Sequence, residues 1–288
     1  MIAAVIVTYI PEVPKLERLL ESIRHQVSKI YIVNNGPLLD LSRNGYDIDF
    51  DIVQLDENKG IGLAQNIGVQ KAYKEGFSHT LLLDQDSTLE PHSVERLLKG
   101  FVNELVAAVG PTVLDSRNGK AFKYFTYNRF SRSNSLGFDV YVDDFYETDI
   151  LISSGTIVNN KVFQENENFD ELFIEYVDVE WCLRLRASGY KILFSKSVLM
   201  KHELGDSRER LLGVEFPLHQ PHRYYFVVRN ALYCSCRTNF SYYFRFYNLI
   251  RCVALILFVL VKSPGKRLAI LKSSFSGIVD SFKLGRKK

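Results

Sequence analysis

Two aspartates follow an apolar run directly in the segment "LLLDQDSTLEP", residues 81–91. One glutamine separates Asp84 from Asp86, and the three leucines before them are typical of a buried strand that ends in a polar loop. Carboxylates at this spacing can bind one divalent cation, and oxygen ligands favour Mg²⁺ or Mn²⁺. The alternative is a solvated turn or an acidic cap at the start of a helix. The apolar run favours a metal site that holds a diphosphate.

A second acidic group occurs in "FIEYVDVEWCLRLRASGY", residues 173–190. Asp178 and Glu180 interrupt a helical pattern of apolar residues. The simpler interpretation is a pair of exposed helix acids, because Glu180 and Arg184 have the spacing of an ion pair on one helix face. However, Glu175 lies three residues before Asp178, and a like charge there would raise the pKa of Asp178. A raised pKa suits a general base, so Asp178 is the candidate for that role.

The first half of the chain alternates short apolar runs with helical segments. The predicted strands are residues 3–9, 29–35, 50–55, 79–83 and 107–114, and the predicted helices are residues 14–26, 61–76 and 91–101. This alternation indicates an α/β fold with a mostly parallel central sheet covered on both faces. Ligands of such sheets bind beyond the carboxyl ends of the strands. The polar residues predicted at those ends are Thr8, Asn34, Asn35, Asp84 and Asp86.

Glycine patterns exclude one class of nucleotide site. The chain contains neither G-x-x-x-x-G-K-[ST] nor a G-x-G-x-x-G turn between strand and helix, so a dinucleotide-binding fold is not predicted. A nucleotide diphosphate held through a metal needs no such loop. A separate small-residue turn, "SSG" at residues 153–155, is expected to let a substrate approach the backbone.

Composition indicates a globular, cytoplasmic protein. The 288 residues are 47% hydrophobic and 24% charged, which is enough for one large domain with an appendage. The start, "MIAAVIVTYIPEVPK", lacks the basic region and cleavage site of a signal peptide and is interpreted as a first strand. The four cysteines, at positions 182, 234, 236 and 252, are expected to be reduced thiols, with a zinc site as the alternative.

The C-terminal region combines apolar, aromatic and basic segments. The run "CVALILFVLV", residues 252–261, is shorter than the roughly 20 residues of a membrane span. Tyrosines and phenylalanines precede it. Residues 262–288 hold eight basic residues and one acid, a net charge of +7, so the rest of the chain carries −4 of the total of +3. The segment is predicted to be an anchor on an anionic membrane surface, with a helix packed in the protein core as the alternative.

Several motifs occur in a fixed order: "VTY", "VNN", "NKGIGLAQNIG", "DQD", "SSG", "YVDVEWCLRLRASGY" and "KHELG". This order resembles the inverting GT-A glycosyltransferases of the family-two type, over about residues 1–235. "IEYVDVEWCLRLRASGYKI" and "HRYYFVVRN" look most like bacterial rhamnosyltransferases of cell-surface polysaccharide synthesis, of the O-antigen type. The resemblance implies a catalytic domain at residues 1–235 and a helical, membrane-associating region at residues 236–288.

The resemblance also implies site residues. The nucleotide-binding residues would be Thr8, Tyr9, Asn34, Asn58, Gly60, Asn66 and Asp84, the metal ligands Asp84, Asp86 and His202, and the catalytic base Asp178. The alternative for His202 is a packed histidine near a strand end. The family usually has an aspartate where this chain has Asn34, and an amide can also donate to and accept from the edge of a pyrimidine.

The implied reaction is a single displacement with inversion, assisted by Mg²⁺ or Mn²⁺. The expected donor is dTDP-L-rhamnose, and the expected acceptor is a glycan on a lipid diphosphate carrier at the inner face of the cell membrane. Residues 116–148 are expected to help bind the acceptor, and no nucleic-acid partner is expected. The alternatives are a UDP-sugar donor, a non-catalytic nucleotide- or glycan-binding module of this fold, and a structural membrane-surface protein. A sugar-phosphate nucleotidyltransferase would need a glycine-rich N-terminal loop, which this sequence lacks.

Overall fold

The computed structural model describes residues 1–39, 41, 50–135, 141–165, 168–169, 172–202, 208–211 and 214–284, with residues 208–211 and 214–216 described by their backbone alone. Part of the "KHELG" motif, residues 203–205, and the basic residues 286–288 lie outside this description. By its internal contacts the chain forms two compact units. The first comprises residues 1–126, 134–173 and 177–203, and the second comprises residues 127–133, 174–176 and 204–288. The domain boundary expected after residue 235 stays a prediction, because contacts define compact units and not independently folding domains.

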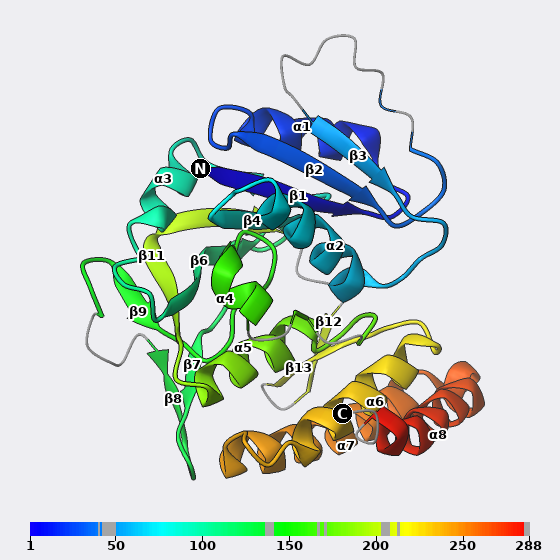
Figure 1. Ribbon diagram of the computed structural model, residues 1–288. Helices are drawn as coiled ribbons and strands as arrows, with labels where there is room; N and C mark the ends of the chain where they lie inside the picture. Colours follow the sequence, from blue (N-terminus) through cyan, green and yellow to red (C-terminus); the bar gives the residue numbers. More distant parts are fainter. Residues whose placement is uncertain are drawn as a thin grey trace. The chain divides into compact units, whose positions relative to one another are not determined.

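A central sheet organises the first unit (Figure 1). Its parallel part comprises β1 (Ile2–Thr8), β2 (Lys29–Asn34), β3 (Phe50–Gln54) and β4 (His79–Asp84). The strand order is β3-β2-β1-β4-β10-β6-β11-β5, where β10 is Ile157–Asn159, β6 is Val106–Asp115, β11 is Lys191–His202 and β5 is Thr88–Leu89. Strand β10 is antiparallel to both β4 and β6, and β11 is parallel to β6. The predicted α/β class with a mostly parallel central sheet is confirmed.

Short strands complete the sheet and its surroundings. Strand β9 (Phe145–Glu147) pairs with β11 in antiparallel orientation. The remaining strands form two small pairs, β7 (Phe125–Tyr127) with β8 (Arg132–Asn134), and β12 (Arg208–Leu211) with β13 (Val214–Pro217).

Several helices accompany the sheet of the first unit. They are α1 (Val13–Ile23), α2 (Ile61–Lys74), α3 (Ser93–Leu98), α4 (Asn160–Glu165) and α5 (Val177–Ala187). The predicted apolar stripe of α1 is buried, since Leu16, Leu19, Leu20 and Ile23 are all inaccessible to solvent. Helix α2 approaches the sheet so closely that a Cβ at Gly68 would lie 2.4 Å from Val5 Cγ1. These contacts fix the strand ends at which the predicted site residues lie.

Three helices dominate the second unit, namely α6 (Arg223–Cys236), α7 (Tyr242–Lys262) and α8 (Arg267–Leu284), with a 3₁₀ turn, Pro264–Lys266, before α8. Helix α7 has 21 residues, because it includes the aromatic stretch before the apolar run. Its first turn is capped by Ser241, whose hydroxyl accepts a hydrogen bond from the Phe244 amide at 3.0 Å. Among the described residues, α7 alone is long and apolar enough to cross a membrane, by length and composition only.

One face of α7 is packed inside the second unit. The shared apolar cluster consists of Tyr224, Val227, Leu255, Phe258, Val259 and Ile270, which come from all three helices. Helix α7 therefore has features of both a core helix and a membrane anchor. One face is buried against α6 and α8, whereas other apolar residues of α7 remain exposed.

All four cysteines are free thiols, as expected from their spacing. Cys182, Cys234 and Cys252 are buried, and Cys236 at the end of α6 is exposed. Burial raises the pKa of the Cys182 thiol well above its usual range and that of Cys252 to about 11. Cys182 and Cys252 are therefore protonated at neutral pH.

Candidate active site

The two aspartates of the D-x-D motif lie against a histidine from the far end of the first unit's sequence. Asp84 is the last residue of β4, and His202 is the last residue of β11. His202 Nε2 lies 3.5 Å from Asp84 Oδ2, and His202 Nδ1 lies 3.4 Å from Asp86 Oδ1. The three predicted metal ligands thus lie together, although they are far apart in the sequence. His202 lies 115 residues after Ser87, which directly follows the D-x-D motif.

Electrostatics distinguish the two carboxylates. Burial raises the pKa of Asp84; the charge of His202 opposes this shift and that of Asp86 adds to it. Burial also acts to raise the pKa of Asp86, but the hydrogen bond and charge of His202 hold it below its usual value. The pKa of Asp84 is therefore the higher of the two.

The donor set can be tested for its fit to a cation. Ligand atoms bound to one Mg²⁺ at about 2.0–2.1 Å lie roughly 3 Å apart, which is near the separation of Asp84 Oδ2 from His202 Nε2. Within the described part of the chain, no group of three or more His, Cys, Asp and Glu side chains is placed so that it could hold a metal ion. Two carboxylates and an imidazole are a donor set that suits a divalent cation, but Asp84 and Asp86 lie at different nitrogens of the His202 ring, so a cation here would need further ligands from a diphosphate and water.

The "SSG" turn connects this cluster to the candidate base. The Ser153 amide faces Asp178 Oδ2 at 3.4 Å, whereas the next residue, Ser154, accepts a hydrogen bond on Oγ from the Asp84 amide at 3.0 Å. Ser154 Oγ also lies 2.6 Å from Ser87 Oγ, which in turn lies 3.2 Å from His202 Nδ1. Two consecutive residues thus hold the two acidic groups close together.

The glycine of this turn has an internal explanation. Gly155 adopts φ 83°, and a Cβ there would lie 2.5 Å from Met200 Sδ and 2.9 Å from Pro111 Cγ. Packing inside the protein explains why a glycine is required at this position, and the approach of a substrate to the turn stays a prediction.

Asp178 lies in the first turn of α5. Its Oδ1 accepts a hydrogen bond from the Val179 amide at 2.9 Å, and its Oδ2 faces the Ser153 amide. Arg223 Nε binds Glu175 Oε1 at 2.7 Å and compensates its charge, so an influence of Glu175 on Asp178 stays a prediction. The case for Asp178 as a base therefore depends on its place next to the D-x-D cluster.

Glu180 has a structural role. It is fully buried, and Arg184 Nε and Nη2 bind its two carboxylate oxygens at 3.0 Å. The expected pairing of these two residues is confirmed, but the pair is buried and not exposed. Arg184 Nη2 also donates to the carbonyl of Asn168 at 2.9 Å. Removal of either partner from such a pair usually destabilises a fold, because an unpaired charge remains buried.

Thr8 and Asn34 form a buried brace beneath the turn after β2. Thr8 Oγ1 donates to Asn34 Oδ1 at 2.9 Å, and Asn34 Nδ2 donates to the Pro37 carbonyl at 2.6 Å and to Gln54 Oε1 at 2.8 Å. Both side chains are inaccessible to solvent, whereas Tyr9 is 49% exposed. Direct contact of Thr8, Tyr9 and Asn34 with a nucleotide stays a prediction.

The loop before α2 is tied to the same region by amides. Asn35 Nδ2 donates to Asn58 Oδ1 at 2.9 Å, and Asn58 Oδ1 also accepts from the Gly60 amide at 2.9 Å. Asn66 exchanges two hydrogen bonds with the backbone of Phe169, at 2.9 and 3.0 Å. The predicted pocket residues thus shape this loop, and their contact with a nucleotide stays a prediction.

Gln85 is a site residue that the sequence pattern did not single out. Its Oε1 accepts from the Tyr9 amide at 2.8 Å, and its Nε2 lies 3.3 Å from the Tyr9 carbonyl. This pairing joins the loop after β4 to the loop after β1. Its place in the loop directly after β4 was the available signal, because β4 pairs in parallel with β1 and the loops after both strands leave the same edge of the sheet.

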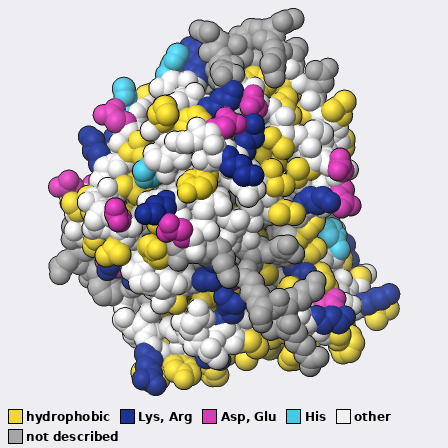
Figure 2. Space-filling view, in the orientation of Figure 1, with side chains coloured by type: hydrophobic (Ala, Val, Ile, Leu, Met, Phe, Trp, Pro, Cys, Tyr) yellow, Lys and Arg dark blue, Asp and Glu magenta, His cyan; other side chains and the backbone are white. Residues whose placement is uncertain are grey.

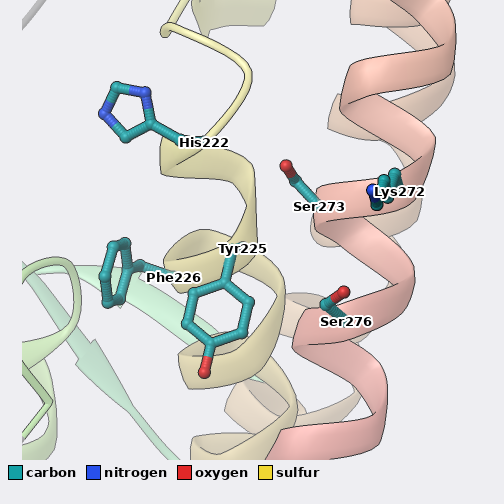
Figure 3. A pocket seen from close by; sticks show the side chains of 6 residues that line it. All are labelled: His222, Tyr225, Phe226, Lys272, Ser273 and Ser276. Atoms are coloured by element: carbon teal, nitrogen blue, oxygen red, sulfur yellow. The ribbon is translucent and has the colours of Figure 1, made fainter.

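A shallow pocket of about 340 Å³ lies on the second unit. Figure 3 shows Tyr225 and Phe226 on α6 with His222 just before it, and Lys272, Ser273 and Ser276 on α8. None of the predicted site residues lines it.

An acidic cluster at the strand ends of a mostly parallel sheet suits an enzyme that acts on nucleotide sugars. Comparison with known proteins indicates the same class of enzyme. The chain belongs to glycosyl transferase family 2, whose family model matches residues 4–166. It is also 34% identical over 235 residues to the dTDP-rhamnosyl transferase RfbF of Shigella flexneri, which covers 80% of this chain and 78% of that protein. The resemblance to family-two enzymes is confirmed.

Solved structures share the fold. TarS 1–349 of S. aureus in complex with UDP-GlcNAc matches 97% of this chain and 81% of its own, with a TM-score of 0.61 and 14% identity. GalNAc-T7 with UDP, GalNAc and Mn²⁺ matches 74% of this chain with a TM-score of 0.59 and 14% identity. The chain spans 44% of the length of that GalNAc-T7 chain. At this level of identity the likeness shows the fold alone.

Proposed function

We propose that this chain transfers L-rhamnose from dTDP-L-rhamnose to a hydroxyl group of a lipid-linked surface-polysaccharide acceptor, with inversion at the anomeric carbon. The observation that carries the proposal is the turn at Ser153 and Ser154, which holds Asp178 beside the cluster of Asp84, Asp86 and His202. A base and a diphosphate site must be close together for one displacement. The choice of donor follows from the similarity to a dTDP-rhamnosyl transferase.

Asp178 supplies the proton acceptor in this mechanism. The amides of Ser153 and Val179 orient its carboxylate, which takes the proton from the acceptor hydroxyl. The hydroxyl oxygen forms a bond to the anomeric carbon while the bond from that carbon to the diphosphate oxygen breaks. The electron pair leaves with the dTDP. Because attack and departure occur on opposite faces, the configuration inverts in one step.

Asp84, Asp86 and His202 are the residues that would hold Mg²⁺ or Mn²⁺. A divalent cation supplies positive charge that stabilises the departing diphosphate. Gln85 holds the loop after β1 against the D-x-D loop, and so keeps the proposed nucleotide and diphosphate sites in register.

A UDP-sugar donor is the second candidate, because both similar structures contain UDP or a UDP-sugar. A screen of nucleotide sugars with Mg²⁺ or Mn²⁺ separates the two candidates. We expect release of dTDP from dTDP-L-rhamnose and no release of UDP from UDP-sugars. Release of UDP alone would assign the other donor, and tight nucleotide binding without any turnover would favour a non-catalytic module.

We also propose that the second unit lies on the inner, anionic face of the cell membrane. Helix α7 exposes an apolar stripe at helical spacing, formed by Phe246, Leu249, Ile250, Val253, Leu257 and Val261. Helix α8 exposes a second stripe, formed by Leu268, Leu271, Phe275, Ile278, Val279 and Phe282. Exposed apolar patches of this kind are typical of membrane or protein interaction sites.

Charge favours a lipid partner. Exposed basic residues accompany the stripes, namely Arg251, Lys262, Lys266, Arg267, Lys272 and Lys283. Figure 2 shows hydrophobic and basic side chains next to one another along its lower margin. The buried face of α7 and the buried, hydrogen-bonded Asn248 favour a helix that lies in the interface over one that crosses the bilayer. Each basic residue near such a surface contributes about 1 kcal/mol.

Loss of the apolar stripe on α7 is expected to abolish membrane binding. The triple variant Val253→Ser, Leu257→Ser and Val261→Ser should remain in the supernatant when it is centrifuged with anionic vesicles at low salt. The wild type should sediment and be partly released by high salt. Leu38→Ser and Val102→Ser remove exposed apolar residues of the first unit and serve as matched controls that should still sediment. Wild-type protein that ignores anionic vesicles at low salt would contradict the proposal.

A further inference from the structure

The segment that leads into α5 has an unusual backbone. Phe173, Glu175 and Tyr176 adopt φ values of 62°, 62° and 65°, although none of them is glycine. This left-handed region is sparsely populated by residues with bulky side chains. Such a conformation persists only where the surroundings determine it, and it occurs often at functional sites. The side chains that contact residues 173–176 therefore determine the backbone conformation at the start of α5.

Asn230 of α6 holds the middle of this segment. Its side chain is inaccessible to solvent, and its Nδ2 donates to the carbonyls of Ile174 and Glu175, each at 2.8 Å. Asn230 Oδ1 accepts from Arg229 Nε at 2.8 Å, so the amide is held in one orientation. One buried side chain thereby binds two consecutive carbonyls of a strained backbone.

Two side chains of the segment are bound as well. Glu175 accepts from Arg223 Nε at 2.7 Å, and the Tyr176 hydroxyl donates to Asn248 Oδ1 at 2.6 Å. All of these contacts lie within the second unit, to which residues 174–176 belong. Helices α6 and α7 thus fix the three residues before Val177.

The preceding residue is fixed by the first unit. The Ile61 amide donates to the Phe173 carbonyl at 2.7 Å, and a Cβ at Gly60 would lie 2.4 Å from Phe173 Cα. Residues 173–176 are thus held along their whole length. Asp178 follows Tyr176 by two residues, so the start of α5 sets the position of its backbone, and the amides of Ser153 and Val179 contact its carboxylate.

We propose that Asn230 is a positioning residue for Asp178, because it sets the backbone that leads into the first turn of α5. Asn230 does not touch the reacting atoms. This inference rests on the proposed role of Asp178 as general base. It extends the reaction machinery to a helix that carries none of the residues proposed to bind the donor.

The test compares Asn230→Ala with Asn239→Ala, which removes an exposed asparagine of the same unit. Steady-state kinetics with dTDP-L-rhamnose, calorimetric binding of dTDP, and amide hydrogen exchange are measured on the full-length chain. We expect Asn230→Ala to lower kcat by about 10²-fold, as small misplacements of a reacting group do. The dissociation constant for dTDP should stay within about twofold of wild type, and exchange should become faster in peptides from residues 172–182. Asn239→Ala should match wild type in all three.

A double variant separates positioning from a general loss of structure. If Asn230 acts through Asp178, adding Asn230→Ala to Asp178→Asn should lower kcat no further. Multiplicative losses, or wild-type kcat for Asn230→Ala, would overturn the inference while leaving the proposed function intact. Wild-type kcat for Asp178→Asn would instead overturn the assignment of the base. If the wild type turns over no donor, the proposed function fails. The exchange measurement then decides whether Asn230 holds the segment, and unchanged exchange would overturn that as well.

Discussion

Asp178→Asn is expected to lower kcat by about 10²–10⁴-fold, the usual contribution of a general base. Asparagine has nearly the same size as aspartate, and its Oδ1 can still accept the hydrogen bond from the Val179 amide. It cannot take a proton from the acceptor hydroxyl. The dissociation constant for the donor should therefore remain near that of wild type. Steady-state transfer kinetics, together with calorimetric donor binding, measure both quantities.

The matched control for this variant is Asp51→Asn. Asp51 lies on β3 and pairs with Lys29 and Lys71, and strands β2 and β1 separate β3 from β4, which carries Asp84. We expect wild-type kcat for it. Wild-type kcat for Asp178→Asn would show that the base lies elsewhere. The nearby acids Glu175 and Glu180 are poor replacements because each is bound by an arginine.

Asp86→Ala is expected to abolish measurable transfer, with a loss of about 10³-fold, equivalent to roughly 4 kcal/mol of transition-state stabilisation. The variant removes one proposed cation ligand, which also holds a negative charge next to His202. The side chain is 28% exposed at a strand mouth, so the fold should be retained. Activity is measured with Mg²⁺ and with Mn²⁺, and circular dichroism verifies the fold.

Chelation of the wild type provides the companion experiment. Activity should be lost with a chelator and restored by added Mg²⁺ or Mn²⁺. Asp51→Ala, which removes a carboxylate of the same type from β3, should respond to chelation and metal as the wild type does. Full activity of chelator-treated wild type would refute the metal interpretation of the D-x-D motif and leave the family assignment untouched.

Sequence periodicity predicted the parallel part of the sheet and the buried face of α1. Those elements are long, and the spacing of apolar residues such as Leu16 and Leu19 is enough to predict which face is buried. Strand β10, in contrast, has three residues and depends on pairing with β4 and β6. A pattern with a period of two cannot be recognised in three residues, and the partners lie far away in the sequence.

The candidate site divides in the same way. Asp84 and Asp86 lie at the end of a strand, and the order of motifs predicted that His202 belongs to the same site. The structure places His202 next to both aspartates. The compensation of Glu175 by Arg223 was not predictable, because 48 residues separate the two partners. The internal pairing of Thr8 with Asn34 was equally hidden, since a polar residue at a strand end looks the same whether it faces a ligand or a neighbour. Sequence thus identifies residue types at strand ends, and the partners of each side chain require the structure.

The distribution of the four thiols provides a practical means of observing this protein. Cys182, Cys234 and Cys252 are enclosed, and Cys236 is exposed at the end of α6, six residues after Asn230. A maleimide dye added to the unmodified protein should therefore attach at one place without any substitution. That place lies in the unit proposed to meet lipid and on the helix proposed to position Asp178. Quenching of the dye by labelled vesicles would report docking, and its anisotropy would report restraint at the end of α6, in the same sample and during turnover.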